Sequence, residues 1–259
     1  MRVAYIAAGA AGMYCGTCIH DNTLVAALKR QGVDVALIPT YTPLRTDEEG
    51  VALDHVFFGG INVYLQQKWS LFRHTPRAVD RLLDNPRLLG SLGRLSAATS
   101  AGDLGALTVS VLQGEEGRQQ KELERLVVWL KSDFKPDIVH LTNAMFAGMG
   151  RRLKQELSVP VFCGLQGEDL FLEQLMEPFR TQARDILCQR VADIDIFIAP
   201  CVYYQHYMAD FMQCDPERIR VIPLGLNLDG HGQAPIKVDR SRSVGYLARI
   251  CPEKGFHLL

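Results

Sequence analysis

Short apolar runs rich in valine and isoleucine alternate with helix-like segments along this 259-residue chain. Such runs, without regular polar alternation, are typical of parallel strands buried on both faces of a sheet. They lie at Val3–Ala7, Val35–Pro39, Ile138–Leu141, Val159–Leu165, Ile194–Ala199, Ile219–Leu224 and Ser243–Leu247. Between them apolar residues recur with helical spacing, as at Leu123, Leu126, Val127 and Leu130. The alternation predicts an α/β fold with a doubly wound, mostly parallel, Rossmann-like sheet.

Charge and cysteine content exclude several classes of protein. The 29 acidic and 28 basic residues give a net charge of -1, so we expect no nucleic-acid partner, while a local patch leaves peripheral membrane contact open. No apolar run reaches the roughly 18 residues that a membrane-spanning helix needs, and the N-terminal run is better suited to a first strand than to a signal peptide. Seven scattered cysteines do not form a secreted disulfide framework. We therefore expect a cytoplasmic protein with reduced thiols.

The pattern of runs is interrupted in two places. A polar, helix-rich insertion is expected near residues 69–117, with Pro76 and Pro86 as helix starts. Residues 227–241 are rich in glycine and polar residues and are typical of a linker, which puts a domain boundary near residue 230. The chain from residue 231 to 259 is then predicted to be this linker and the truncated start of a second domain, a strand, loop and helix beginning at Ser243.

Polar residues after the strands are the candidate site residues, because parallel sheets bind ligands at the carboxyl ends of their strands. Gln166, Glu168 and Asp169 follow the fourth run, and such groups are suited to hydrogen bonding with sugar hydroxyls. The two acids are equally suited to the N-terminal end of a following helix. His140 alternates with apolar neighbours, so its position is also typical of a core histidine, and Asn143 closes the same run.

A glycine-rich loop follows the first run, from Gly9 to Gly16, and leads into a predicted helix. It would let a ligand approach the backbone, or simply let the helix pack close to the sheet. Its glycines lack the G-x-G-x-x-G spacing and no acidic residue ends the second strand, so a nicotinamide site is disfavoured.

The same loop contains Cys15-Gly-Thr-Cys18, a C-x-x-C sequence at a helix start, where redox pairs of thioredoxin type lie. A plain packing role for these small residues is the alternative. Metal binding would need further ligands, and no second C-x-x-C or H-x3-5-H spacing supplies them, so we expect no metal.

Taken together, the strand ends resemble glycosyltransferase family 4, retaining enzymes of the GT-B architecture with two facing Rossmann-like domains. The segment Val221–Asn227 is similar to the family's end of the N-terminal domain, and Val244–Gly255 is similar to its first C-terminal strand and turn. Residues 1–230 would accordingly be the acceptor-side N-terminal domain. Gln166 stands where many members have a histidine next to an aspartate.

This resemblance implies metal-independent transfer, with retention, of a sugar from a nucleotide sugar to an acceptor that is a glycan, a lipid carrier or a small metabolite. The nucleotide sugar would be a substrate, and no cofactor is expected. The implied roles are donor-phosphate binding by Arg249, Lys254 and Gly12, acceptor binding by Tyr14, Asp21, His140 and Asn143, and catalysis by Gln166, Glu168 and Asp169. The family's paired-glutamate element would lie beyond Leu259, so we expect the 259-residue chain by itself to be inactive. A non-catalytic Rossmann-like binding domain and a thiol redox protein are the alternatives.

Overall fold

A computed structural model describes residues 1–9, 15–59, 63, 65–67, 69, 72, 75, 101–230, 244–248, 250 and 252–259. Within these residues the chain divides into two compact units, Met1–Leu226 and Asn227–Leu259. Unit 1 contains all the strands and helices that surround the candidate site. Unit 2 contains two short 3-10 turns, Pro252–Lys254 and Phe256–Leu258, with the ring of Tyr246 4.8 Å from that of Phe256. The start of a nucleotide-sugar-binding domain in unit 2 remains a prediction.

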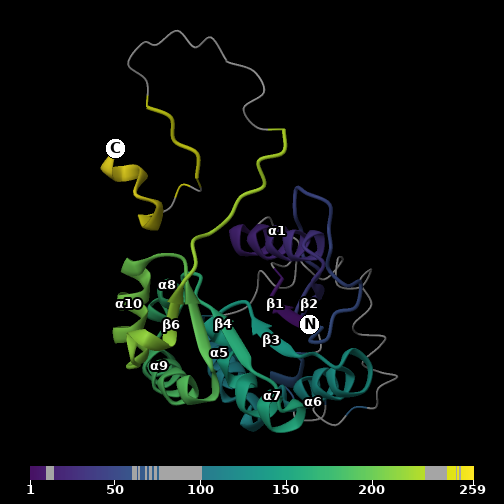
Figure 1. The fold of residues 1–259 in the computed structure, drawn as a ribbon. Helices are drawn as coiled ribbons and strands as arrows, with labels where there is room; N and C mark the ends of the chain where they lie inside the picture. Colours follow the sequence, from purple (N-terminus) through teal and green to yellow (C-terminus); the bar gives the residue numbers. More distant parts are fainter. Residues whose placement is uncertain are drawn as a thin grey trace. The chain divides into compact units, whose positions relative to one another are not determined.

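Unit 1 is built on a parallel sheet in the order β2-β1-β3-β4-β5-β6, with every strand pair parallel (Figure 1). The six described strands are β1 (Arg2–Ala7), β2 (Asp34–Pro39), β3 (Ile138–Leu141), β4 (Val161–Gly164), β5 (Ile196–Ala199) and β6 (Ile219–Val221). Ala52, which belongs to none of these strands, forms a single parallel bridge to Leu37 of β2. The predicted α/β, Rossmann-like fold class is confirmed.

Helices connect these strands. The described ones are α1 (Gly16–Arg30), α5 (Ala101–Gln113), α6 (Gln120–Trp129), α7 (Gly150–Leu157), α8 (Glu168–Glu173), α9 (Phe179–Arg190) and α10 (Val202–Met212). Figure 1 shows α1 on one side of the sheet and α5, α7 and α9 on the other. Among the described helices, none is long and apolar enough to cross a membrane.

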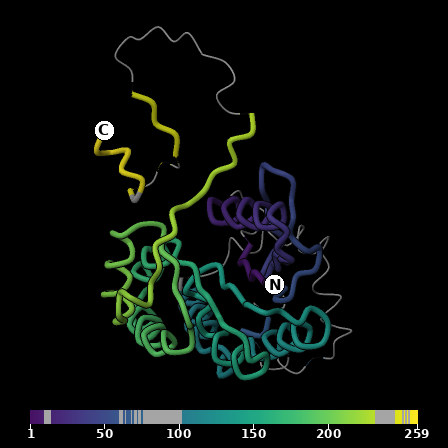
Figure 2. Tube along the Cα trace, viewed as in Figure 1, coloured from purple at the N-terminus to yellow at the C-terminus, as the bar shows by residue number. Residues whose placement is uncertain are grey.

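The sheet separates two hydrophobic cores, because successive side chains of a strand point to opposite faces. Tyr5 packs with Val25 of α1 in the smaller core, whereas Ile6 joins the larger core on the other face. The larger core also takes the stripe of α6 predicted from its spacing, since Leu123 and Leu126 are at most 2% exposed. The strand order changes direction at β1, because β2 pairs with one edge of β1 and β3 with the other. Figure 2 traces the chain through these elements from purple at the N-terminus.

The apolar runs predicted six strands correctly, with differences at their ends. The sixth run ends at Val221 rather than Leu224, because Pro223 has no N–H with which to continue the ladder. The seventh prediction, a strand at Ser243–Leu247, is wrong for its described residues: 244–247 form no strand. Val244 and Leu247 are 82% and 102% exposed, and a lone extended segment is not stable without a neighbouring strand.

The region expected to be a polar insertion includes α5 and the 3-10 turn Gly114–Glu116 (η3), while Pro76 and Pro86 lie outside the described residues. This part of the region is not a polar appendage, since Leu112 of α5 is fully buried in the larger core. The carbonyl oxygen of Leu112, in the last turn of α5, accepts a hydrogen bond from Arg190.

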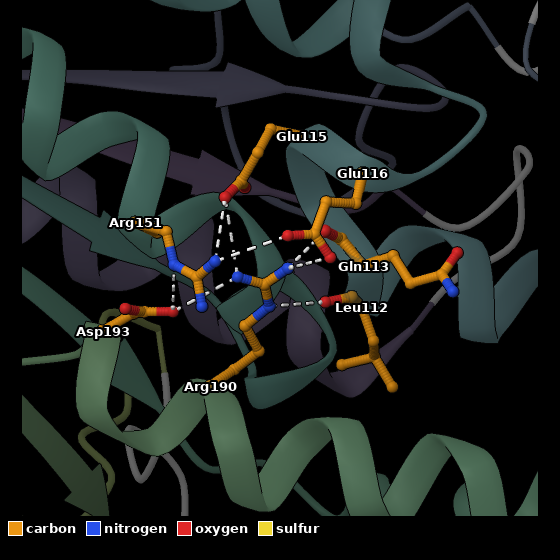
Figure 3. Close-up of polar contacts among 7 residues, drawn as sticks. All are labelled: Leu112, Gln113, Glu115, Glu116, Arg151, Arg190 and Asp193. Atoms are coloured by element: carbon orange, nitrogen blue, oxygen red, sulfur yellow. Dashed lines mark hydrogen bonds and ion pairs between the residues drawn. The ribbon is translucent and has the colours of Figure 1, made fainter.

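Arg190, at the end of α9, holds the C-terminal end of α5 in place (Figure 3). Only 3% exposed, its guanidinium donates to the carbonyl oxygens of Leu112 and Gln113 and lies 3.4 Å from Asp193 and 3.6 Å from Glu115. A guanidinium is favourable at a helix C-terminus because it faces unpaired carbonyls at the negative end of the helix dipole. Buried charges are stabilising only when paired in this way.

Replacing Arg190 with methionine should lower the free energy of unfolding by about 2–4 kcal/mol, because it leaves the carbonyl oxygens of Leu112 and Gln113 without their donor. The matched control is Arg180→Met, which removes a half-exposed guanidinium paired with Glu177 and should cost under about 1 kcal/mol. Urea denaturation of both variants measures the difference. Equal losses would show that Arg190 does not anchor α5.

Candidate functional site

The candidate site lies at the carboxyl ends of β1, β3 and β4. The chain leaves β1 toward β2 on one side, and runs from β3 to β6 on the other, so the loops after β1 and β3 diverge. In open parallel sheets this is the place where ligands bind. The polar residues that follow β3 and β4, together with one residue of α1, meet here through hydrogen bonds.

Asp21 of α1 is the centre of these contacts. It is 1% exposed, and its carboxylate accepts hydrogen bonds from the Tyr5 hydroxyl at 2.7 Å and the Thr142 hydroxyl at 2.6 Å. The Gln166 amide donates to it at 3.2 Å, and Nδ1 of His20 lies 3.4 Å away. A buried carboxylate needs several donors to offset its lost hydration. Asp21 thus joins α1 to β1 and to the segments after β3 and β4.

Gln166 follows β4 and is partly buried. Its amide nitrogen donates to the Thr142 carbonyl at 2.9 Å and to the Thr142 hydroxyl at 3.2 Å, besides Asp21. Because these oxygens accept, the amide oxygen of Gln166 must point away from them. That oxygen has no hydrogen-bond partner among the described residues and is not buried, so it can accept a hydroxyl of a ligand.

His140 of β3 lies beside this cluster, with its ring centroid 4.4 Å from that of Tyr5. Burial lowers the pKa of His140 from 6.5 to about 4, and the Asp21 charge offsets this only in part. The imidazole is therefore neutral at pH 7 and can both donate and accept a hydrogen bond. A side chain at Gly164 of β4 would contact Nε2 of His140 and overlap the carbonyl of Thr142, so glycine keeps this space open.

Glu168, at the start of α8, is committed to the backbone. One carboxylate oxygen accepts from the N–H of Ala144 at 2.9 Å, and the other accepts from the N–H of Gln166 at 2.6 Å. Burial raises the pKa of Glu168, and the backbone N–H groups partly offset that rise. With both oxygens occupied and 5% exposure, Glu168 ties the segment after β3 to the segment after β4.

Asp169 accepts a hydrogen bond at 2.5 Å from the hydroxyl of Tyr204 on α10. The same hydroxyl accepts a hydrogen bond from the N–H of Gly167 at 2.9 Å. Gly167 has a φ of 90°, in the left-handed region that suits glycine, and this conformation starts α8 directly after the turn. Tyr204 therefore fixes the turn that carries both acidic residues.

The remaining predicted residues are dispersed. Asn143 is the N-cap of the 3-10 turn Ala144–Met149 (η5), where its side chain accepts from the N–H of Met145 at 3.1 Å. Lys254 is exposed in unit 2. Gly12, Tyr14 and Arg249 lie outside the described residues. The structure thus brings together Asp21, His140, Gln166, Glu168 and Asp169 with Asn143 nearby in sequence. No group of metal-ligating side chains that could hold an ion occurs among the described residues.

Three residues of the site were not predicted from the sequence: Tyr5, Thr142 and Tyr204. Thr142 had a usable signal, because it lies two residues after His140 and so on the same side of the strand. Tyr5 is a single hydroxyl within an apolar strand, and Tyr204 lies within α10. Nothing local in the sequence indicates their carboxylate partners.

The lowered pKa of His140 predicts a specific pH dependence of stability. Protonation is harder in the folded state, so the stabilisation is present above pH 6.5 and is lost as pH falls toward 4. In His140→Phe this loss should disappear, a difference of up to about 3 kcal/mol between the two profiles at low pH. Denaturant titrations from pH 7 to 4 measure it, with exposed His206→Phe as control. Parallel profiles for wild type and His140→Phe would contradict the assignment.

Comparison with known families identifies the family of the chain. The family described as "Glycosyl transferase 4-like domain" matches residues 20–225, more than half of the chain. The match begins within α1, so that it includes Asp21, and covers every strand from β2 to β6. The search of curated proteins found no match. On the strength of the family match and the parallel α/β sheet, the chain belongs to the glycosyl transferase 4-like domain family.

Proposed function

We propose that this chain is the acceptor-side domain of a retaining glycosyltransferase that takes its sugar from a nucleotide sugar. The family match supports the transferase class. The observation that carries the proposal further is the cluster at the carboxyl ends of β1, β3 and β4, where Gln166 is anchored by its nitrogen and leaves its amide oxygen free. An anchored amide beside a neutral imidazole is suited to uncharged hydroxyl groups, which sugars present in number.

Gln166 would bind a hydroxyl of the reacting sugar, with His140 beside it at the acceptor. A neutral histidine is suited to orient an acceptor hydroxyl, because it offers one donor and one acceptor nitrogen. Tyr14 and Asn143 complete the proposed acceptor side. Asp21 is 1% exposed, so we assign it to positioning Gln166 and Thr142 rather than to direct acceptor contact.

Glu168 and Asp169 act through their neighbours in this proposal. Glu168 holds two backbone N–H groups with its two oxygens, and Asp169 orients Tyr204. Rigid support of this kind contributes to catalysis because a hydrogen bond that is already oriented needs no reorganisation when the reaction occurs. Neither carboxylate needs to transfer a proton for this role.

The diphosphate of the nucleotide sugar would be bound by Arg249 and Lys254, with Gly12 allowing close backbone approach. Two cations can stabilise the charge that develops on a leaving diphosphate, in place of a metal ion. The acceptor is a glycan, a lipid carrier or a small metabolite, and its class is left to experiment.

Gln166→Ala should reduce kcat/KM for transfer from the nucleotide sugar about 3- to 10-fold, the value of one neutral hydrogen bond to the sugar. The assay is release of nucleoside diphosphate by the complete protein, screened first over UDP-, GDP- and ADP-sugars. Gln182→Ala on α9 is the matched control, because it removes the same side chain from an exposed position and should leave the rate unchanged.

Three outcomes would contradict the proposal. Equal rates for Gln166→Ala and wild type would remove Gln166 from the sugar site. A product whose anomeric configuration by NMR is opposite to that of the nucleotide sugar would exclude a retaining mechanism. Binding of nucleotide sugars without any turnover would favour a non-catalytic binding domain.

A further inference from the structure

Cys15 and Cys18 form a pair of thiols at the start of α1. Cys15 is the N-cap residue, with extended backbone angles (φ -133°, ψ 133°), and its carbonyl accepts the helical hydrogen bond from Ile19 at 3.0 Å. Cys18 lies three residues on, in the first turn. Side chains with this spacing share one face of a helix. Cys15 is partly exposed and Cys18 is 3% exposed, and both are free thiols.

The two thiols are in different electrostatic states. The pKa of Cys15 is lowered to about 5, chiefly because the thiol of Cys18 donates to its sulfur, with help from the backbone N–H groups of Cys18 and Thr17. The pKa of Cys18 is raised, first by that same interaction and then by burial. The accessible thiol of Cys15 therefore ionises more readily than an ordinary cysteine, whereas the buried thiol of Cys18 stays protonated.

We propose that Cys15 and Cys18 are a reversible dithiol–disulfide site, oxidised by disulfides of low molecular weight. The C-x-x-C spacing at the start of α1 places an accessible thiol at the N-cap and a buried thiol in the first helical turn, which is the arrangement that an attacking and a resolving thiol need. Because Cys15 precedes the helix, its side chain can close onto Cys18 while its carbonyl keeps the bond to Ile19. The proposed thiol chemistry uses neither the sugar nor the nucleotide of the proposed transferase reaction.

The reaction balances with one disulfide molecule, RS–SR. The Cys15 thiolate attacks one sulfur, forming a Cys15–SR bond and releasing RS⁻, which takes up a proton. The Cys18 thiol then loses its proton, and its sulfur attacks the sulfur of Cys15, breaking the Cys15–SR bond and releasing the second RS⁻. The net change is oxidation of two protein thiols to one disulfide and reduction of RS–SR to two RSH.

The other described cysteines lack one or more of these properties. Cys163 is fully buried, and its pKa is raised by burial. Burial also raises the pKa of Cys188 and of Cys214. Cys201 is exposed but belongs to no C-x-x-C sequence. Oxidation is therefore expected first at Cys15.

The test is exposure of the complete protein to oxidised glutathione, followed by alkylation of free thiols and peptide mass mapping. A Cys15–Cys18 disulfide that dithiothreitol reverses supports the proposal. Cys18→Ser should stop at a stable glutathione mixed disulfide on Cys15, whereas Cys201→Ser should form the same internal disulfide as wild type. A disulfide mapped to another pair, no oxidation of Cys15, or no mixed disulfide in Cys18→Ser would overturn it.

A kinetic measurement keeps the proposal testable if a variant folds poorly. In the wild-type protein at pH 6, iodoacetamide should alkylate Cys15 about tenfold faster than Cys201. The reason is that the large thiolate fraction of Cys15 outweighs the lower intrinsic nucleophilicity of an acidic thiol. Equal rates at the two residues would contradict an activated Cys15. These readouts involve no sugar, so their failure leaves the proposed transferase function untouched.

Discussion

The buried carboxylate of Asp21 is the constraint on which the arrangement of the site depends. A charged group with 1% exposure is strongly destabilising unless donors surround it, and the donors here come from three different parts of the chain. Tyr5 is on β1, Thr142 follows β3 and Gln166 follows β4. The need to provide hydrogen-bond donors to one carboxylate therefore fixes α1 relative to the strand ends where the strand order reverses.

Glu168 repeats this principle one step further along the sheet edge. Its two oxygens take the N–H groups of Ala144 and Gln166, so that the turn after β4 cannot move independently of the turn after β3. Buried acidic groups thus hold Gln166 from both its side chain and its backbone. Such double support is what positions a binding side chain precisely, because its own rotamer is locked by neighbours. The amide oxygen of Gln166 is left free to accept a hydrogen bond.

Much of the fold could be predicted from sequence, because buried strands and helix faces have local patterns of apolar residues. The run at Ile138–Leu141 matches β3 to the residue, and the α6 stripe is buried as its spacing predicted. The Ser243–Leu247 prediction failed because apolar composition indicates burial only where a neighbouring strand exists to pair with it. The region of 101–116 was expected to be polar and lies partly in the core, since Leu112 and Arg190 meet across 78 residues of chain.

The candidate site was only partly predictable for a related reason. The positions of His140 near the end of β3 and of Gln166, Glu168 and Asp169 after β4 could be predicted, because topology alone brings strand ends together. Their tasks could not, because the partner of a carboxylate is set by three-dimensional contact: Ala144 is 24 residues from Glu168, and Thr142 is 121 residues from Asp21. Sequence therefore indicates which residues lie at the rim, while the contacts decide which of them are free to bind.

The central claim is that Asp21 organises this rim, and a double-mutant cycle tests it most directly. Free energies of unfolding would be measured for wild type, Asp21→Ala, Thr142→Val and the double variant. A coupling energy of about 1–3 kcal/mol between the two positions is expected for groups that share a buried hydrogen bond. Losses that add within about 0.3 kcal/mol would show that the two side chains act independently, and would contradict the account.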